Sequence, residues 1–397
     1  MLIKQDAQTI HTVVLDDCRN TIEEFVAVAR YHAKVEFSQG YRDRVTASRK
    51  SLEATIASGV GVYGVNTGFG DNVRYRITED EMVQLQENIL RSHGCSVGRA
   101  LSEEEARALM LMQLMSIGKG YSAVSLEMPE QIRTYLNADL YPYAPCEGTI
   151  GGLSFQPYIA ITYMGVGLLA LYDFVMTMRH ADLTAALVCK ALRSTDKAYD
   201  PRLIALKNHK ETADTARFLR DILSGSAIMD ESRSLRVQDS MNTRIIPHVH
   251  GIAKRMAGQT YDALMEELYA VFDNPIFLPD GTALMGSNWD ATAIELYCDS
   301  LAIAVMDVAK LTEVHMERLV DPHLSSLVSM TMLTALQAID LSDHKAMSPV
   351  TQKIHDHARQ TVTFIENDDL MYQRIEAMEH LVESNQLLAD CSVPFTI

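Results

Sequence analysis

The chain of 397 residues is 47% hydrophobic and 22% charged, a composition typical of globular proteins with a sizeable core. Its formal net charge of -17 argues against nucleic acid or an anionic membrane as a partner, because a polyanion would be repelled. The six cysteines form no CxxC pair, no apolar run is long enough to cross a bilayer, and the N-terminus lacks a signal-peptide pattern. We therefore expect a cytoplasmic protein with neither a disulfide framework nor a zinc site.

Helical periodicity dominates the sequence. Residues 102–118 read SEEEARALMLMQLMSIG, with Ser102 as the expected N-cap, and apolar residues recur at three- and four-residue steps through residues 299–320 and 350–388. Alternating strand patterns and Asn-Gly hairpin turns are almost absent. The sequence therefore predicts an all-α fold, in which long helices with apolar stripes assemble side by side.

The first polar segment is GVYGVNTGFGDNV, residues 61–73. It lacks the lysine of a phosphate-binding loop. Its glycines permit positive φ angles and would carry Tyr63 and Asn66 on a mobile or strained loop. The alternative is a structural turn in which Tyr63 packs on the core.

Two further segments surround helix boundaries. In LQENILRSHGCSVG, residues 85–98, a helix is expected to end near His93, which either caps the helix or titrates near neutrality. The segment FDNPIFLPDGTALMGSNWDA, residues 272–291, reads as a loop punctuated by proline and glycine, followed by a long helix.

The densest group of polar residues lies in VQDSMNTRIIPHVHG, residues 237–251. Arg244 is the natural partner for a carboxylate, because its planar guanidinium can bind both oxygens. His248 and His250 have the spacing of a metal pair, but the segment offers no third ligand, so we do not predict a metal site.

These segments, in this order, resemble the aromatic amino acid ammonia-lyase family, which includes histidine, phenylalanine and tyrosine ammonia-lyases and related aminomutases. The resemblance continues through SIGKGYSAV, LNADLYPYAP, YDPRLIA and LTALQAIDLSDHKAMSP, and covers most of the chain. It implies a single domain, residues 1–397, in which residues 1–150 carry the Tyr63 loop and residues 151–397 form a central bundle and C-terminal helices. It also implies a homotetramer whose active sites combine residues from several subunits.

The family's chemistry depends on an electrophile, methylidene-imidazolone, made when an internal Ala-Ser-Gly cyclises and loses water. In the family the tripeptide lies between a Gly-Ser-Val-Gly-like turn and a helix that ends in Gly-x-Gly. This chain retains both flanks, at residues 148–151 and 165–167, but has three residues fewer between them. The resemblance therefore predicts that the tripeptide is missing and that the chain has no cofactor.

Other family residues are also replaced. Met241 stands where the family has a catalytic tyrosine, and Trp289 and Asp290 stand where it has Phe-His. Two further segments, one of which carries a catalytic-site glutamate, have no counterpart. Tyr63, which matches the family's loop base, remains, as does Arg244, which matches the group that binds the substrate carboxylate.

One hypothesis is an enzyme that needs no electrophile. Tyr63 would act as acid or base, with His93 or His248 as the complementary group and Arg244 as the carboxylate anchor. The substrate, a small aromatic or conjugated carboxylate, would supply its own activation through a better leaving group such as a quaternary ammonium, or through a carbonyl open to addition, isomerisation or cyclisation. The expected substrate-binding residues are Arg244, Gln238, Asn66, Trp289, Met241 and Asp290.

The rival hypothesis is a non-catalytic homologue. Because family active sites are shared between subunits, a degraded copy could serve as partner or scaffold for an active paralogue, or as a binding protein. Loss of the tripeptide, a tyrosine and a glutamate favours this alternative. Retention of Tyr63, Gln238 and Arg244 favours the enzyme.

Overall fold

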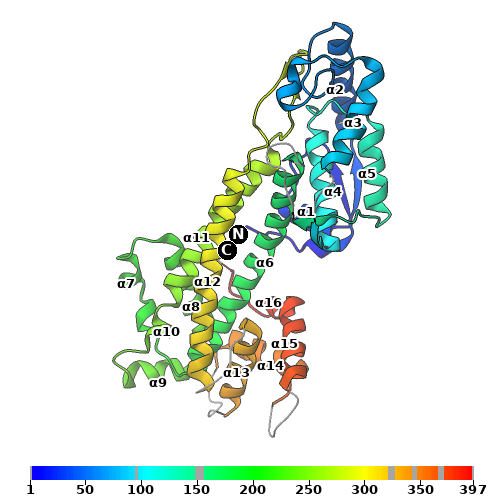
Figure 1. The fold of residues 1–397 in the computed structure, drawn as a ribbon. Coiled ribbons are helices and arrows are strands. Elements are labelled where there is room, and N and C mark those ends of the chain that lie inside the picture. The colour runs from blue at the N-terminus through cyan, green and yellow to red at the C-terminus, as the bar shows by residue number, and fades with distance from the viewer. Residues whose placement is uncertain are drawn as a thin grey trace. The chain divides into compact units, whose positions relative to one another are not determined.

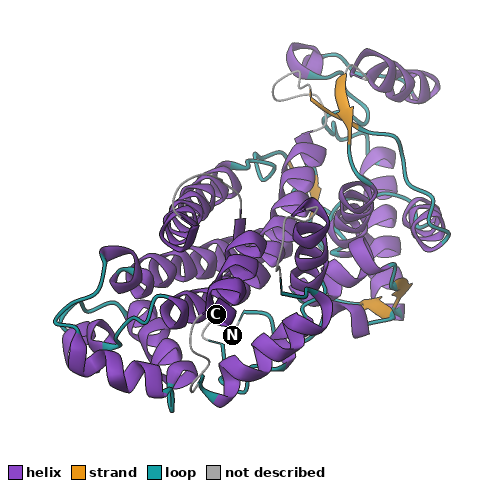
Figure 2. Cartoon of the chain, turned by 90° about the horizontal axis from the view of Figure 1, so that it is seen from below, coloured by secondary structure: helices purple, strands orange, loops and turns teal. Residues whose placement is uncertain are grey.

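The computed structural model describes residues 2–93, 97–147, 156–320, 327–341, 347–364 and 371–395. Helices dominate these residues, and the strands are only two to four residues long (Figures 1 and 2). The predicted all-α class is confirmed. Within the described ranges, no helix is both long and apolar enough to span a membrane.

Tertiary contacts divide the chain into two compact units, each described by itself. The N-terminal unit comprises residues 3–172 and 261–296, and the C-terminal unit comprises residues 1–2, 173–260 and 297–397. Three long helices contribute residues to both units: α6 (Gln156–Ala191), α11 (Ile246–Tyr269) and α12 (Thr292–Val320).

The N-terminal unit contains five further α-helices among its described residues, with short strands between them. The helices are α1 (Ile22–Tyr31), α2 (Gln39–Ala57), α3 (Glu79–His93), α4 (Glu103–Gly118) and α5 (Glu127–Asn137). The 3-10 helices are η1 (Ala7–Thr9) and η2 (Gly70–Arg74). The strands are β1 (Thr12–Leu15) and β2 (Lys34–Phe37), paired in parallel, and the antiparallel pairs β3 (Val97–Ala100) with β4 (Pro145–Glu147) and β5 (Ile276–Phe277) with β6 (Ala283–Leu284).

Local sequence explains where the helices of this unit begin. α4 starts with a capping box: the Ser102 hydroxyl accepts from the Glu105 N–H, and the Glu105 carboxylate accepts from the Ser102 N–H. Thr21 and Glu24 form the same device at the start of α1. The predicted N-cap at Ser102 is confirmed. It could be predicted because its sequence signal lies within four consecutive residues.

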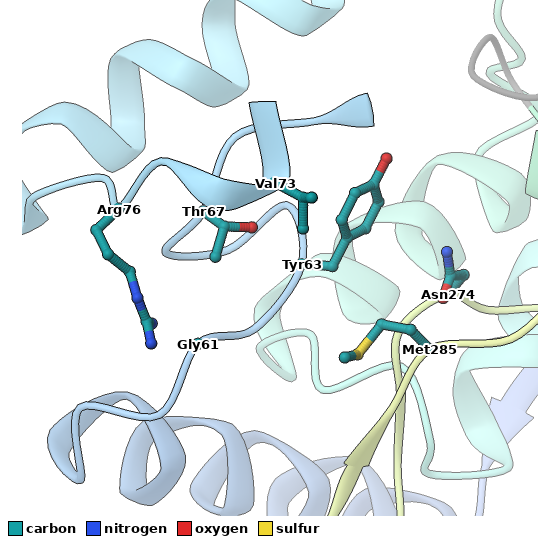
Figure 3. Close-up of a pocket in the computed structure, with 7 residues that line it drawn as sticks. All are labelled: Gly61, Tyr63, Thr67, Val73, Arg76, Asn274 and Met285. Atoms are coloured by element: carbon teal, nitrogen blue, oxygen red, sulfur yellow. The ribbon is translucent and has the colours of Figure 1, made fainter. Parts of the chain in front are cut away.

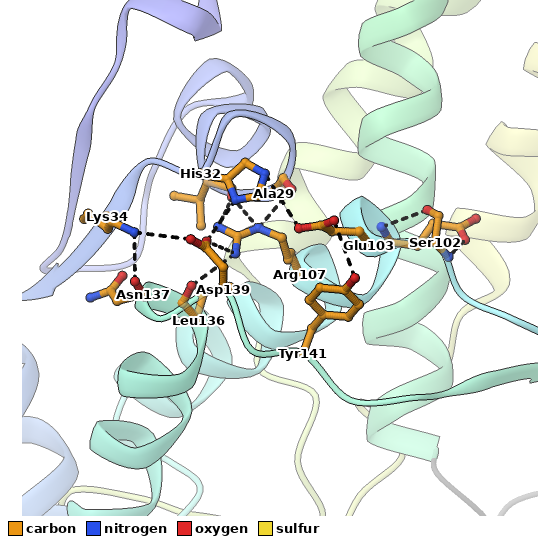
Figure 4. A network of polar contacts seen from close by, with 12 residues as sticks. Ala29, His32, Lys34, Ser102, Glu103, Arg107, Leu136, Asn137, Asp139 and Tyr141 are labelled. Carbon is orange, nitrogen blue, oxygen red and sulfur yellow. Dashed lines mark hydrogen bonds and ion pairs between the residues drawn. The ribbon is translucent and has the colours of Figure 1, made fainter.

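A buried arginine holds three of these helices together (Figure 4). Arg107 of α4 is 1% exposed, and its guanidinium donates to the carbonyls of Val28 and Ala29 in the last turn of α1 and to that of Leu136 in the last turn of α5, at 2.9 to 3.2 Å. Its Nη1 also donates to Asp139 at 2.9 Å. These carbonyls lack intrahelical partners, so one cation satisfies the ends of two helices.

The C-terminal unit has an apolar core formed by its parts of α6, α11 and α12 together with shorter helices. The shorter elements are η4 (Lys197–Tyr199), α7 (Pro201–Ala205), α8 (Lys210–Leu223), α9 (Ala227–Leu235), α10 (Met241–Arg244), α13 (Leu327–Leu341), α14 (Pro349–Thr361), α15 (Met371–Glu383) and α16 (Gln386–Ala389). α13 and α14 pack on α15, and α14 also packs on α8.

A buried polar cluster joins α6 to α11 inside this unit. Asp182 is fully buried and accepts from Lys254 Nζ at 2.5 Å, while its other oxygen lies 2.8 Å from His250 Nδ1. Lys254 also donates to the Thr215 hydroxyl of α8 at 3.0 Å. Paired in this way, the carboxylate has a lowered pKa despite its burial, which acts in the opposite direction. His250, half of the possible metal pair, is thus bound to a carboxylate.

The substitution Arg107→Met tests the role of the buried arginine. It would leave the Val28 and Ala29 carbonyls of α1 without this donor and the Leu136 carbonyl of α5 with only backbone donors such as the Asp139 N–H, so we expect the free energy of unfolding to fall by about 2 to 4 kcal/mol. Arg91→Met is the matched control, since Arg91 is exposed on α3 and, among the described residues, pairs with Glu87 alone; it should change stability by less than about 0.5 kcal/mol. Urea unfolding measures both, and equal effects would contradict the assigned role.

Candidate functional site

The loop that carries Tyr63 is shaped by its glycines. Gly64 and Gly70 have φ angles of +68° and +57°, as their sequence context predicts, whereas Gly68 has no positive φ. A Cβ on Gly64 would lie 2.5 Å from the ring of Phe69, which meets the Tyr63 ring edge-on with centroids 5.8 Å apart. The Tyr63 hydroxyl accepts from the Gly70 N–H at 3.0 Å. The glycines therefore let the loop fold back on Tyr63.

Asn66 braces the same loop. Its side chain is 7% exposed; Oδ1 accepts from the Val62 N–H at 2.7 Å, and Nδ2 donates to the Val60 carbonyl at 2.8 Å. The Asn66 carbonyl also accepts from the Ile77 N–H at 3.0 Å, which fixes the returning part of the loop. These contacts give Asn66 a structural role, and its predicted role in substrate binding stays a prediction.

Tyr63 lines an open cavity of about 410 Å³ in the N-terminal unit (Figure 3). The cavity combines the Tyr63 loop with the segment 272–291. Its lining residues are Gly61, Tyr63, Thr67, Val73, Arg76, Asn274 and Met285. The sequence analysis missed Arg76, Asn274 and Met285 as site residues. Asn274 lies in the DNP motif, which could have indicated it, whereas nothing in the local sequence singles out Arg76 or Met285.

Asn274 is held in place from two sides. Its Oδ1 accepts from the Gly286 N–H at 3.1 Å, and the preceding Asp273 accepts from the Ser122 hydroxyl at 2.5 Å. Burial raises the pKa of the Asp273 carboxyl. Among the residues that the structure describes, Nδ2 of Asn274 has no hydrogen-bond partner, so the amide can donate to a molecule in the cavity.

Trp289 and Asp290 come from the same segment but are not among the residues that line this cavity. Asp290 is exposed, and its Oδ1 accepts from the Thr292 N–H at 3.1 Å, at the start of α12. The carboxylate thus satisfies a helix N-terminus. Its substrate-binding role, and that of Trp289, remain predictions.

The other predicted site residues belong to the C-terminal unit. They lie in the segment 237–251, which is anchored by buried Asp239; this carboxylate accepts from the Thr195 N–H at 2.5 Å. Gln238 and Met241 on either side are exposed. Arg244 is the last residue of α10, and its buried Nε has no partner among the described residues. That unpaired donor is compatible with binding a carboxylate.

His248 lies in the first turn of α11 and is partly buried. Burial lowers its pKa, and the neighbouring Lys207 and His209 lower it further. The imidazole is therefore biased toward its neutral form near pH 7, the form that can accept a proton.

The predicted residues thus divide between the two units. Tyr63, Asn66, Trp289 and Asp290 belong to the N-terminal unit, and the residues from Gln238 to His248 belong to the C-terminal unit. His93 ends α3 as predicted, but its side chain lies outside the described residues, as does the turn at 148–151. In the described ranges, no three His, Cys, Asp or Glu side chains are grouped as metal ligands.

The fold is shared with enzymes that act on amino acids and related compounds. A histidine ammonia-lyase structure from Trypanosoma cruzi matches with a TM-score of 0.85 at 22% identity, over 96% of this chain and 94% of the other. The ergothioneine-degrading ergothionase of Treponema denticola matches with a TM-score of 0.83 at 19% identity, over 95% of this chain and 99% of the other.

Sequence comparison defines the family. The aromatic amino acid lyase family model matches residues 20–167 and 160–330. Histidine ammonia-lyase of Treponema denticola is 32% identical over 353 residues, covering 77% of this chain and 69% of the relative. Histidine ammonia-lyase 2 of Fusobacterium nucleatum is 26% identical over an alignment of 490 positions, covering 93% of this chain and 96% of the relative. The chain belongs to the aromatic amino acid lyase family, which confirms the resemblance based on its motifs.

Asn66→Ala tests the brace of the Tyr63 loop. It would leave a buried N–H without an acceptor, so we expect the free energy of unfolding to fall by about 1 to 3 kcal/mol and the loop to become more sensitive to protease. Asn88→Ala, on the exposed face of α3, removes one side-chain bond within the described ranges, from Gln84, and should change stability by less than about 0.5 kcal/mol. If both variants resist urea and protease equally, Asn66 does not brace the loop.

Proposed function

We propose that this chain is a lyase-like enzyme that performs acid/base elimination, addition, isomerisation or cyclisation on a small aromatic or conjugated carboxylate, without methylidene-imidazolone. The observation that carries the proposal is the position of Tyr63: its braced loop presents the phenol ring to a cavity of about 410 Å³. A phenol beside a bound substrate can transfer a proton, whereas a purely structural tyrosine needs no cavity.

Sequence supports the absence of the electrophile. The flanks of the family's tripeptide are retained with three residues fewer between them, within a stretch that includes residues outside the described ranges. The end-to-end alignment with the Fusobacterium relative spans 490 positions, more than the 397 residues of this chain, so the relative has segments without a counterpart here.

Without an electrophile, the substrate must make its own reaction easier. A quaternary ammonium leaves more readily than ammonia does from an ordinary amino acid, and a conjugated carbonyl makes a neighbouring proton more acidic. Tyr63 would remove or deliver that proton, with His248 or His93 as the complementary group. Arg244 would bind the carboxylate through its guanidinium. An enzyme that degrades ergothioneine shares this fold, and this similarity supports a substrate of this kind for the present chain.

We also propose that the active site is shared between subunits. The candidate base, Tyr63, and the candidate carboxylate anchor, Arg244, belong to separate compact units. We propose a homotetramer in which residues of several subunits complete each site, with an active paralogue as an alternative partner.

The alternative is a non-catalytic partner or binding protein. Met241, at the position of the family's catalytic tyrosine, is 68% exposed and can neither donate nor accept a proton usefully. This observation favours the alternative if turnover needs a residue at that position.

The substitution Tyr63→Phe tests the proposed acid/base role, because it removes one hydroxyl and little volume. We expect turnover to fall at least about 100-fold, measured as release of ammonia or trimethylamine from aromatic amino acids and the trimethylammonium betaine of histidine, and as the change in ultraviolet absorbance of conjugated unsaturated acids. Tyr75→Phe, on the same segment but exposed, should stay within about twofold of wild type. Full activity of Tyr63→Phe would eliminate the role.

Intact-mass spectrometry tests the absence of the electrophile. The expected mass is that of the unmodified sequence, because cyclisation needs the missing Ala-Ser-Gly. A histidine ammonia-lyase that contains the tripeptide is the positive control. A mass two water molecules below the sequence mass would refute the absence of the electrophile.

A further inference from the structure

The cavity beside Tyr63 contains a cation without an internal anion. Arg76 lines the cavity and makes no ion pair among the described residues, and no acidic side chain is among the lining residues. Arg76 is exposed, and although the protein has 52 acidic and 35 basic residues, no acidic side chain lines the cavity with it. The Arg76 guanidinium is therefore available to an anion that enters the cavity.

The backbone of Arg76 is fixed to the Tyr63 loop. Arg76 forms an isolated antiparallel bridge with Thr67, and on either side of it the Tyr75 carbonyl accepts from the Gly68 N–H at 3.1 Å and the Ile77 N–H donates to the Asn66 carbonyl at 3.0 Å. The bonds that hold Tyr63 in place therefore hold Arg76 as well.

The guanidinium of Arg76 lies against Gly61 (Figure 3). A Cβ at position 61 would be 2.6 Å from one terminal nitrogen of Arg76 and 2.7 Å from its central carbon. The missing side chain of Gly61 is what gives the cation room along this wall. The other polar groups that line the cavity include the Asn274 amide, whose Nδ2 has no partner in the described ranges of the chain.

We propose that Arg76 is the anion-binding group of this cavity and holds the carboxylate of a small molecule next to Tyr63. The planar guanidinium can donate two parallel hydrogen bonds to a carboxylate, and the Asn274 amide adds a neutral donor. The inference rests on the proposed function in one respect, since it takes the bound carboxylate to belong to the substrate. Arg76 is the partner of a carboxylate beside Tyr63 because both residues belong to the N-terminal unit, whereas Arg244 belongs to the C-terminal unit.

Direct binding of benzoate to the full-length protein tests the inference without requiring turnover. Isothermal titration calorimetry would compare benzoate with benzamide, which has the same shape and no charge. We expect Arg76→Gln to raise the benzoate dissociation constant at least about tenfold, as for loss of a charged hydrogen bond, and to leave benzamide unchanged. The benzoate affinity of the wild-type protein should also fall as salt is added.

Two matched variants separate charge from position. Arg74→Gln removes a neighbouring exposed arginine that stacks on Tyr75 and does not line the cavity, and it should stay within about twofold of wild type. Gly61→Ala keeps the Arg76 charge but displaces its guanidinium, and should also weaken benzoate binding several-fold. Gly61 has no positive φ, so alanine fits its backbone, and this variant serves if Arg76→Gln fails to fold.

The outcomes separate this inference from the proposed function. Wild-type protein that binds no benzoate at millimolar concentration, Arg76→Gln that binds it normally, or equal losses for benzamide would each overturn the inference. Loss of benzoate binding in Arg244→Gln alone would assign the anion to Arg244 and leave the proposed function standing. Conversely, weaker binding by Arg76→Gln together with full turnover by Tyr63→Phe would support the anion site and remove the proposed acid/base role.

Discussion

The packing of the helices in the N-terminal unit depends on one requirement: the buried carbonyls at helix ends must find hydrogen-bond donors. Arg107 meets it for α1 and α5 and thereby fixes α4 against both. At the other end of α4, Lys119 donates to carbonyls at the end of α11, and burial lowers its pKa to about 8. Shortly after Lys119, the chain reaches the turn whose Ser122 holds Asp273 beside Asn274. The position of one wall of the Tyr63 cavity therefore follows from how the ends of α4 are satisfied.

The opposite wall is tied to the same turn by a small apolar core. Leu52 of α2, Val62 of the Tyr63 loop, Ala123 and Phe277 of β5 are buried together, and the Phe277 N–H donates to the Tyr121 carbonyl at 3.0 Å. Packing thus brings the Tyr63 loop and the segment 272–291 together from opposite ends of the unit's sequence. The polar groups of the cavity are presented by backbone that is already fixed, which limits the entropy lost when a ligand binds.

Features with local causes could be predicted from the sequence. The cap at Ser102 and the end of α3 at His93 depend on neighbouring residues, and the long helix expected over 299–320 begins at Thr292, where Asp290 accepts from the backbone. The strands were missed because runs of two to four residues carry too little alternation to detect. The cavity was missed in part because only the tertiary structure brings Arg76 and Met285 into one cavity with Tyr63. The structural role of Asn66 could not be predicted, because the bonds from its side chain to its own loop cannot be read from residue type alone.

Two arginines distinguish a binding function from a purely structural one. A cation that only supports a fold is normally satisfied within it, as Arg107 is by carbonyls and Asp139, because a desolvated donor without a partner costs free energy. Arg244 has a buried Nε without a partner in the described ranges, whereas Arg76 is exposed in its cavity and makes no ion pair there, in a chain with many more acidic than basic residues. A scaffold would gain stability by pairing them, whereas an enzyme or binding protein for carboxylates gains function by leaving them open, so the two arginines favour a retained small-molecule site over a purely structural copy.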